Sequence, residues 1–202
     1  TSRGATALFL ACQEGHTDCA RLCLEAGAKV DAVMADGGTP LQLACLNGHT
    51  DCARLCLRAG AKVGAANEDG TTALHVACHE GRLSCARLCL EFKADVNLAT
   101  QSGVTPLMAA WARPDCARLC LEAGADVNLA DDEGDTLLNV ACLNGRADSA
   151  RLCLEAGANV NSADNEGRTP LFMACQEGHT ACARLCLAFK AAADRAARQG
   201  PP

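Results

Sequence analysis

Aromatic side chains are scarce in this chain, which has 202 residues but no Tyr, one Trp and only four Phe. Half of the residues are nevertheless apolar. A core built from such a chain must consist mainly of small aliphatic side chains, because large rings are not available to fill it. This composition favours short, closely packed helices over one large globular centre.

Other absences exclude classes of function. No apolar run approaches the roughly 20 residues that span a bilayer, and the formal net charge of −6 gives no basic footprint for nucleic acid. Gly-x-Ser-x-Gly, a Gly-rich phosphate loop and His-Glu-x-x-His are all missing, and the carboxylates recur at regular positions instead of converging on one pocket. We therefore predict a chain that is not an enzyme, has no catalytic residues, cofactor or metal, and binds neither nucleic acid nor membrane.

An internal repeat organises the sequence. The Ala of each "CARLCL"-like unit recurs at intervals of 33, 33, 31, 33 and 33 residues, at Ala20, Ala53, Ala86, Ala117, Ala150 and Ala183. Six repeats follow, at about 1–33, 34–66, 67–99, 100–130, 131–163 and 164–190. We predict one repeat domain over residues 1–190 and a helical or disordered tail over 191–202.

The sequence pattern of each repeat predicts two short helices. A Gly-containing turn precedes a Thr that begins the first helix, as in "TPLQLACLNG", and a second helix such as "TDCARLCLEA" ends at another Gly before an extended segment. Helix pairs this short cannot bury their apolar faces alone, so each must stack on its neighbours. Repeat four is two residues shorter, with "ARPD" between its helices, and Pro114 is expected at the first position of its second helix.

These motifs resemble the ankyrin repeat. The matching features are the 33-residue period, helix starts such as "TPLQ" and "TALH", "GHTD" between the helices, and "GADVN" after the second helix. The resemblance covers all six repeats. It implies an all-α fold, an ankyrin-repeat solenoid of six stacked helix-turn-helix units with β-turn fingers, and a monomer.

The sixteen cysteines occupy three repeat positions. They lie late in the first helix (Cys12, Cys45, Cys78, Cys142, Cys175), early in the second (Cys19, Cys52, Cys85, Cys116, Cys182), and one turn later (Cys23, Cys56, Cys89, Cys120, Cys153, Cys186). Trp111 and Ser149 occupy the two remaining positions. The resemblance implies that these positions face neighbouring helices, where Cys acts as a small apolar residue, so we predict a cysteine-rich core. Trp111 either fills volume beside the shortened turn or serves as an exposed anchor.

Other interpretations of the cysteines are less favoured. A zinc site needs four ligands, and no second pair or His is placed by the sequence to meet each Cys pair. Equivalent positions of stacked helices lie roughly 8–10 Å apart, too far for a disulfide. A redox-sensing thiol stays open as an alternative. Without a disulfide framework or a secretory signal in "TSRGATALFLACQEG", we predict an intracellular protein of the cytoplasm, with the nucleus as the alternative.

The resemblance implies a non-enzymatic scaffold that binds a protein segment in a concave groove formed by the fingers and the first helices. Mapped onto this chain, the groove residues are Asp36, Leu46, Asn47, Glu68, Asp69, His79, Gln101, Asp132, Glu133, Asp135, Leu143, Asn144, Glu166 and Arg168. Of eighteen finger residues, seven are acidic and two basic. The acids are either turn formers or the recognition surface for a basic segment of an unidentified partner protein.

Two further functions stay open on the sequence alone. One is a targeting or substrate-recognition module from a larger multidomain protein, such as an enzyme, channel or ubiquitin-ligase adaptor, because the chain lacks an initiator Met and its first repeat starts late. The other is a cysteine-based redox sensor.

Overall fold

The computed structural model describes residues 6–35 and 37–199, with side chains through residue 194. These residues form helices joined by turns, and their only extended pairings are two isolated bridges, Ala66 with Thr72 and Ala130 with Thr136. The chain divides into two compact units, an N-terminal unit, Thr1–Gly124, and a C-terminal unit, Ala125–Pro202. The predicted all-α class is confirmed.

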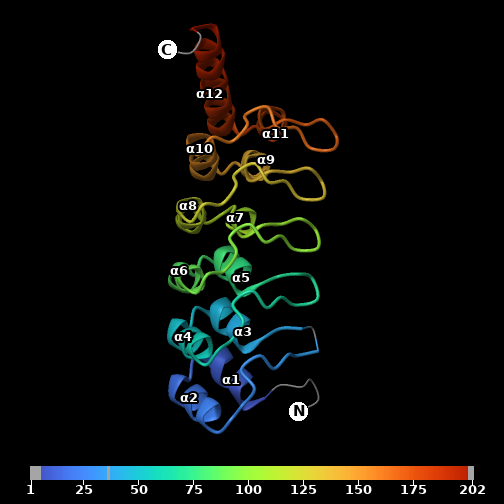
Figure 1. Ribbon diagram of the computed structural model, residues 1–202. Helices are drawn as coiled ribbons and strands as arrows, with labels where there is room; N and C mark the ends of the chain where they lie inside the picture. Colours follow the sequence, from blue (N-terminus) through green and yellow to red (C-terminus); the bar gives the residue numbers. More distant parts are fainter. Residues whose placement is uncertain (1–5, 36, 200–202) are drawn as a thin grey trace. The chain divides into compact units, whose positions relative to one another are not determined.

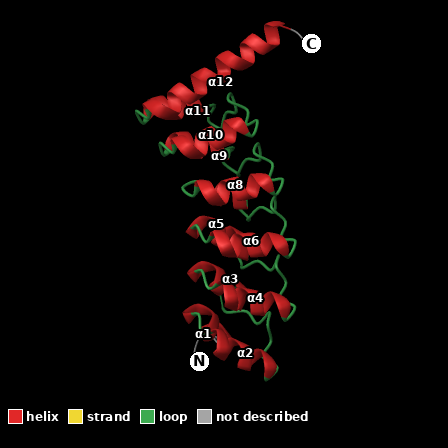
Figure 2. Cartoon of the chain, turned by 90° about the vertical axis from the view of Figure 1, so that its left-hand side faces the viewer, coloured by secondary structure: helices red, strands yellow, loops and turns green. Residues whose placement is uncertain are grey.

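The N-terminal unit contains four helix pairs (Figure 1). They are α1 (Ala7–Glu14) with α2 (Thr17–Glu25), α3 (Pro40–Asn47) with α4 (Thr50–Arg58), α5 (Ala73–Glu80) with α6 (Leu83–Glu91), and α7 (Pro106–Ala109) with α8 (Pro114–Glu122). The first helices pack in the order α1, α3, α5, α7. The second helices pack in the order α2, α4, α6, α8, as Figure 2 shows from their side. In repeats three and four the finger, which is the turn before the Thr that begins the first helix, lies on the side of the first helix away from the second helix.

The C-terminal unit contains two helix pairs. They are α9 (Leu137–Leu143) with α10 (Ala147–Glu155), and α11 (Pro170–Gln176) with α12 (Thr180–Gln199). α11 packs on α9, and α12 packs on α10. α12 continues without a break past residue 190, where the repeat domain was predicted to end. Repeat three also lacks the Gly that follows a second helix, yet α6 ends at Glu91, so the continuation of α12 is due to the Ala-rich run after Lys190, which favours helix.

A capping box begins several of the first helices. In repeat two the Thr39 hydroxyl accepts a hydrogen bond from the Gln42 N–H at 3.2 Å, and the Gln42 side-chain oxygen accepts from the Thr39 N–H at 2.8 Å. This exchange satisfies N–H groups that a helix start otherwise leaves without a partner. His75 and Asn139 occupy the same position as Gln42 and complete the boxes in repeats three and five.

The same three side chains join repeats two, three and five to the finger that follows each of them. Gln42 Nε2 donates to the Thr71 carbonyl at 2.6 Å, His75 Nε2 lies 3.1 Å from the Val104 carbonyl, and Asn139 Nδ2 donates to the Arg168 carbonyl at 3.4 Å. All three side chains are buried. Burial without such partners would be costly, so these bonds fix the position of the following finger on the helix.

A second bond between repeats comes from the residue that follows the first-helix Gly. His49 Nε2 lies 3.1 Å from the Gln13 carbonyl, and Arg82 Nε donates to the Leu46 carbonyl at 3.1 Å. Gly15 adopts φ 75°, and a Cβ at this position would lie 2.5 Å from His49 Nδ1. Glycine is therefore required here both by the backbone conformation and by the close approach of the next repeat.

The two-residue deletion in repeat four shortens its first helix. α7 has only four residues, and α8 begins at Pro114, as predicted from its sequence. The side chain of Arg113 still donates from Nε to the His79 carbonyl at 3.3 Å. The shortened repeat thus keeps the bond to its neighbour while losing a helical turn.

Cysteine forms much of the core. Thirteen of the sixteen side chains are buried, Cys23 is half-buried, and only Cys19 and Cys175 are exposed, in the first and last repeats. The prediction of a cysteine-rich core is confirmed for those thirteen. The sequence analysis did not anticipate that sulfur atoms of adjacent repeats would touch, which they do at positions that are not equivalent in the repeat.

Candidate protein-binding surface

The fingers are rigid turns closed by a polar side chain at their base. In repeat three Asn67 Oδ1 accepts hydrogen bonds from the N–H groups of Asp69 at 3.1 Å and Thr71 at 2.8 Å, and the Asn67 N–H donates to the Thr71 carbonyl. This Asx turn lets the chain reverse direction at Gly70, which has φ 82°. The tip residues Glu68 and Asp69 are left exposed.

Aspartate forms the same turn in the C-terminal unit. Asp131 Oδ1 accepts from the N–H groups of Glu133 and Asp135, and Asp164 Oδ1 accepts from those of Glu166 and Arg168. The turn-forming acids thus occupy the base of the finger. The acidic residues predicted to line a groove lie further along, where Asp132, Glu133 and Glu166 are exposed.

Neighbouring fingers are hydrogen-bonded to each other within each unit. In the N-terminal unit Gln101 donates from its backbone to the Asp69 carbonyl at 2.9 Å and from Nε2 to the Glu68 carbonyl at 2.7 Å. In the C-terminal unit Asn165 donates in the same way to the carbonyls of Glu133 and Asp132, at 3.0 and 2.8 Å. The predicted site residue Gln101 therefore holds the backbone at the tip of the preceding finger.

The first helices contribute exposed apolar and polar side chains. Leu46 is 38% exposed, and Leu143 holds the equivalent exposed position in repeat five. Asn47 and Asn144 each donate from Nδ2 to a carbonyl of their own helix, four residues earlier. His79 Nδ1 lies 3.0 Å from the Glu80 carboxylate.

Asp135 does not join this surface. It is only 7% exposed, and its Oδ1 has no hydrogen-bond partner among the described residues. Burial, followed by the negative charges of Asp131 and Asp164, raises the pKa of Asp135 to about 6. The sequence could not reveal this, because the burial depends on how fingers five and six stack. Asp36, another predicted site residue, lies outside the described residues.

Arg168 is held by carboxylates instead of extending from the finger. Its Nε donates to Asp164 Oδ2 at 2.6 Å, and its Nη1 lies 3.3 Å from Glu166. Burial alone would raise the pKa of Asp164, but the N–H groups and guanidinium of Arg168 outweigh it and lower that pKa. The charge of Arg168 is thereby largely compensated within its own finger.

The resulting surface is acidic with small apolar areas. We call it the finger face; its exposed members are Leu46, Asn47, Glu68, Asp69, His79 and Gln101 in the N-terminal unit, and Asp132, Glu133, Leu143, Asn144, Glu166 and the half-buried Arg168 in the C-terminal unit. Its backbone is fixed by the hydrogen bonds described above, so ordering it on binding costs little entropy.

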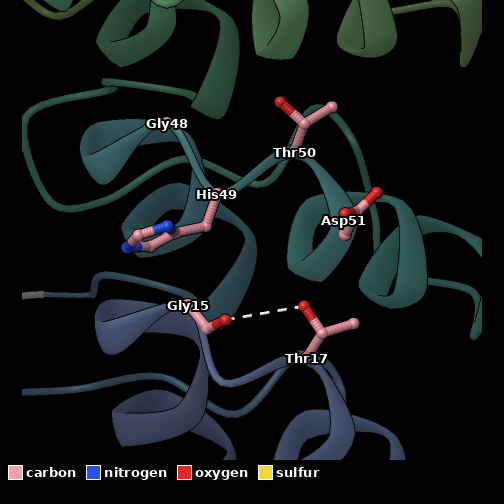
Figure 3. Close-up of a pocket in the computed structure, with 6 residues that line it drawn as sticks. All are labelled: Gly15, Thr17, Gly48, His49, Thr50 and Asp51. Atoms are coloured by element: carbon pink, nitrogen blue, oxygen red, sulfur yellow. Dashed lines mark hydrogen bonds between the residues drawn. The ribbon is translucent and has the colours of Figure 1, made fainter.

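Within residues 6–35 and 37–194 no group of three or more His, Cys, Asp and Glu side chains is arranged to hold a metal ion. A polar hollow of about 290 Å³ opens at the turns of repeats one and two (Figure 3) and is lined by Gly15, Thr17, Gly48, His49, Thr50 and Asp51. The Thr17 hydroxyl donates a hydrogen bond to the Gly15 carbonyl within this hollow. The lining residues all belong to the turns between first and second helices or to the first turn of the second helix. No described helix is both long and apolar enough to span a membrane.

Two functions of single residues were missed by the sequence analysis. One is the bond that Gln42, His75 and Asn139 make to the next finger. The signal was available, since a polar side chain stands three residues after the helix-starting Thr in three of the six repeats. The other is the contact between cysteines of adjacent repeats, for which the sequence holds no comparable signal.

Helix pairs of about 33 residues, Thr-capped first helices and hydrogen-bonded fingers define a class of repeat proteins that present a preformed surface. The chain belongs to the ankyrin repeat family, because a model of three ankyrin repeats matches residues 1–67, 54–131 and 113–196. The ankyrin repeat is a general protein–protein interaction module, typically without enzymatic activity.

Solved structures of the same fold support this assignment. The ankyrin repeat domain of Bcl-3, described as a unique member of the IkappaB family, is 29% identical with a TM-score of 0.82, covering 92% of this chain and 86% of its own. An ankyrin repeat domain from Acinetobacter baumannii AYE is also 29% identical, with a TM-score of 0.82, covering 91% of this chain and 97% of its own. No protein with curated annotation matches the chain.

Proposed function

We propose that this chain is a non-enzymatic scaffold that binds a basic segment of a partner protein on its finger face. The observation that carries the proposal is the exposure of Glu68, Asp69, Asp132, Glu133 and Glu166 at finger tips whose backbones are fixed by hydrogen bonds. The turn-forming function falls on other residues, so these carboxylates are not needed to close the turns.

The chemistry of the face favours a basic, partly apolar segment. Carboxylates on rigid turns create a negative field that accelerates encounter with Lys and Arg side chains and disfavours acidic competitors. Leu46 and Leu143 offer apolar contact beside the acids. Each compact unit carries both features, so each can bind a segment by itself.

Charge reversal tests the proposal. The finger variant carries Glu68→Lys, Asp69→Lys and Glu133→Lys; the control carries Glu25→Lys, Glu122→Lys and Glu155→Lys on exposed positions of the second helices, with the same change in net charge. The probes are Lys/Arg-rich peptides and matched peptides with Glu at every basic position. We expect the basic peptides to bind the parent and the control alike, and the finger variant at least ~10-fold more weakly, with affinity falling as salt rises. Equal affinity for all three proteins would contradict the proposal.

The setting of the protein is part of the same proposal. We place it in a reducing compartment, the cytoplasm or the nucleus, since buried unpaired thiols are typical of such compartments. We propose that it acts as a monomer. The same face would serve whether the chain works alone or within a larger protein.

A further inference from the structure

Sulfur atoms of adjacent repeats lie in contact at four places. Each contact joins a first-helix cysteine to a second-helix cysteine of the following repeat: Cys12 with Cys56 at 3.6 Å, Cys45 with Cys89 at 3.9 Å, Cys78 with Cys120 at 3.5 Å, and Cys142 with Cys186 at 3.6 Å. The pattern is interrupted between repeats four and five, where Trp111 replaces the first-helix cysteine that would face Cys153.

The pair in the last two repeats differs in its surroundings from the two inner pairs, Cys45–Cys89 and Cys78–Cys120. Cys142 lies on α9 and Cys186 on α12, and both side chains are buried. Repeat six, however, is covered less completely than an inner repeat. Leu187 is largely exposed where the equivalent Leu154 of repeat five is buried, and Phe172 is 52% exposed where Asn139 is buried. Helices with one neighbour open locally more easily than helices packed on both sides.

We propose that Cys142 and Cys186 are an oxidation site at which a peroxide forms a disulfide that links α12 to α9. The two sulfurs need to approach by only about 1.5 Å to reach bonding distance, a movement that side-chain rotation in the loosely covered repeat six can supply. The proposal does not depend on partner binding at the finger face.

The hydrogen bond between the two thiols indicates which sulfur attacks the oxidant and which one completes the disulfide. Either thiol can donate in this contact; with Cys142 as the donor, the bond lowers the pKa of the Cys186 thiol, although burial opposes this shift, and the same bond, followed by burial, raises the pKa of Cys142. Because the thiolate is the nucleophile, Cys186 is the sulfur that attacks the oxidant, and Cys142 is the sulfur that resolves the intermediate.

The disulfide forms in two stages. The Cys186 thiolate attacks one oxygen of hydrogen peroxide, the O–O bond breaks, and the departing hydroxide takes a proton to become water, leaving a sulfenic acid. The Cys142 sulfur then attacks the Cys186 sulfur, the S–S bond forms, and the S–O bond breaks. The leaving hydroxide takes the Cys142 proton as a second water. Two thiols lose two electrons, and one peroxide gains them.

The consequence is a reversible covalent link across 44 residues. A link of this kind stabilises chiefly by restricting the unfolded chain. The oxidised protein should hold α11 and α12 on α9 more firmly than the reduced protein does, with slower amide hydrogen exchange in α11 and α12.

The test exposes reduced protein to hydrogen peroxide, blocks the remaining thiols and maps the peptides. Cys19→Ser and Cys175→Ser remove the two exposed thiols and so prevent cross-linking between molecules. Trypsin isolates Cys186 as the one cysteine of residues 185–190. We expect a Cys142–Cys186 cross-link to form before any Cys78–Cys120 cross-link, although the latter sulfurs are closer, and dithiothreitol to reverse it.

Two variants sharpen the result. Cys142→Ala should abolish the cross-link, whereas Cys153→Ala, which removes a buried thiol of repeat five, should leave its yield unchanged. The midpoint of thermal unfolding should rise on oxidation by on the order of 5 °C in the parent and not in Cys142→Ala. If Cys142→Ala fails to fold, the peptide map of the oxidised parent protein tests the proposal by the order in which the Cys142–Cys186 and Cys78–Cys120 cross-links form. A pair that stays reduced until the protein is denatured, or that oxidises no faster than Cys78–Cys120, would overturn the proposal.

Discussion

The same seven residues, "CARLCLE", occur at positions 19–25 in repeat one and 85–91 in repeat three, in different surroundings. Both stretches form the body of a second helix of nine residues, α2 and α6. Leu22 is nevertheless 64% exposed while Leu88 is fully buried, and Cys19 is exposed while Cys85 is buried. α6 packs between α4 and α8, whereas α2 packs on α1 and α4. The local sequence sets the helix, and the preceding repeat supplies the burial.

The largest effect should come from removing a leucine at this shared position. Leu88→Ala should lower the free energy of unfolding by about 2–5 kcal/mol because it leaves a cavity between repeats. Leu22→Ala should cost less than about 1 kcal/mol, since most of that side chain is already in water. Urea denaturation followed by circular dichroism measures both. Similar losses for the two variants would refute the comparison.

A second test uses the polar residue that joins a helix to the next finger. Gln42→Ala removes bonds to Thr39 and Thr71 and should cost about 1–3 kcal/mol, because the buried partners lose their hydrogen bonds. Phe172→Ala, at the same repeat position but half in water, should cost less. Thermal unfolding of the two variants side by side checks the order, and a larger loss for Phe172→Ala would contradict it.

Asp135 offers a test based on pH. Its pKa in the folded protein is about 6, above the ordinary value of 3.8. The folded state therefore binds more protons than the unfolded state between these values, and the associated stability is present below about pH 4 and lost as pH rises through 6. Asp135→Asn should be more stable than the parent at pH 7, by about 1–2 kcal/mol, and equal to it at pH 4. Exposed Asp132→Asn serves as the control, with little change at either pH.

The smallest effect concerns a backbone conformation. Lys93 has φ 66° at the position where repeats one, two, four and five have Gly, and it is the one described residue other than Gly with a positive φ. Lys93→Gly should raise the free energy of unfolding by about 0.5–1 kcal/mol because the left-handed conformation costs Gly least. Lys62→Gly, at an exposed position without this conformation, should give no gain. Chemical denaturation distinguishes the two.

The parts of the fold that depend on local sequence could be predicted. The 33-residue period predicted the helix pairs, Thr39 and its equivalents predicted where the first helices begin, and Pro114 predicted where α8 begins. Contacts that depend on the offset between stacked repeats could not. Cys142 meets Cys186, 44 residues away, and not the equivalent cysteine of the next repeat. Asp135 is buried for the same reason, by the stacking of two fingers, although its neighbours at the tip are exposed.

The candidate site was likewise only partly predictable from the sequence. Family resemblance located the exposed carboxylates at the finger tips, but only the structure separates them from the turn-forming Asp131 and Asp164. Gln101, predicted as a contact residue, holds the preceding finger through two hydrogen bonds.

Labelling of individual thiols in the folded protein tests most directly whether the preceding repeat, and not the local sequence, determines the burial of a second helix. Hydrogen bonds from Cys45 and Thr50 outweigh burial and lower the pKa of the Cys85 thiol to about 7, which by itself would make Cys85 the more reactive sulfur. If burial supplied by repeat two dominates, N-ethylmaleimide should label Cys19 at least ~10-fold faster than Cys85, as peptide mapping would show. Labelling of Cys85 as fast as Cys19, or faster, would contradict this account.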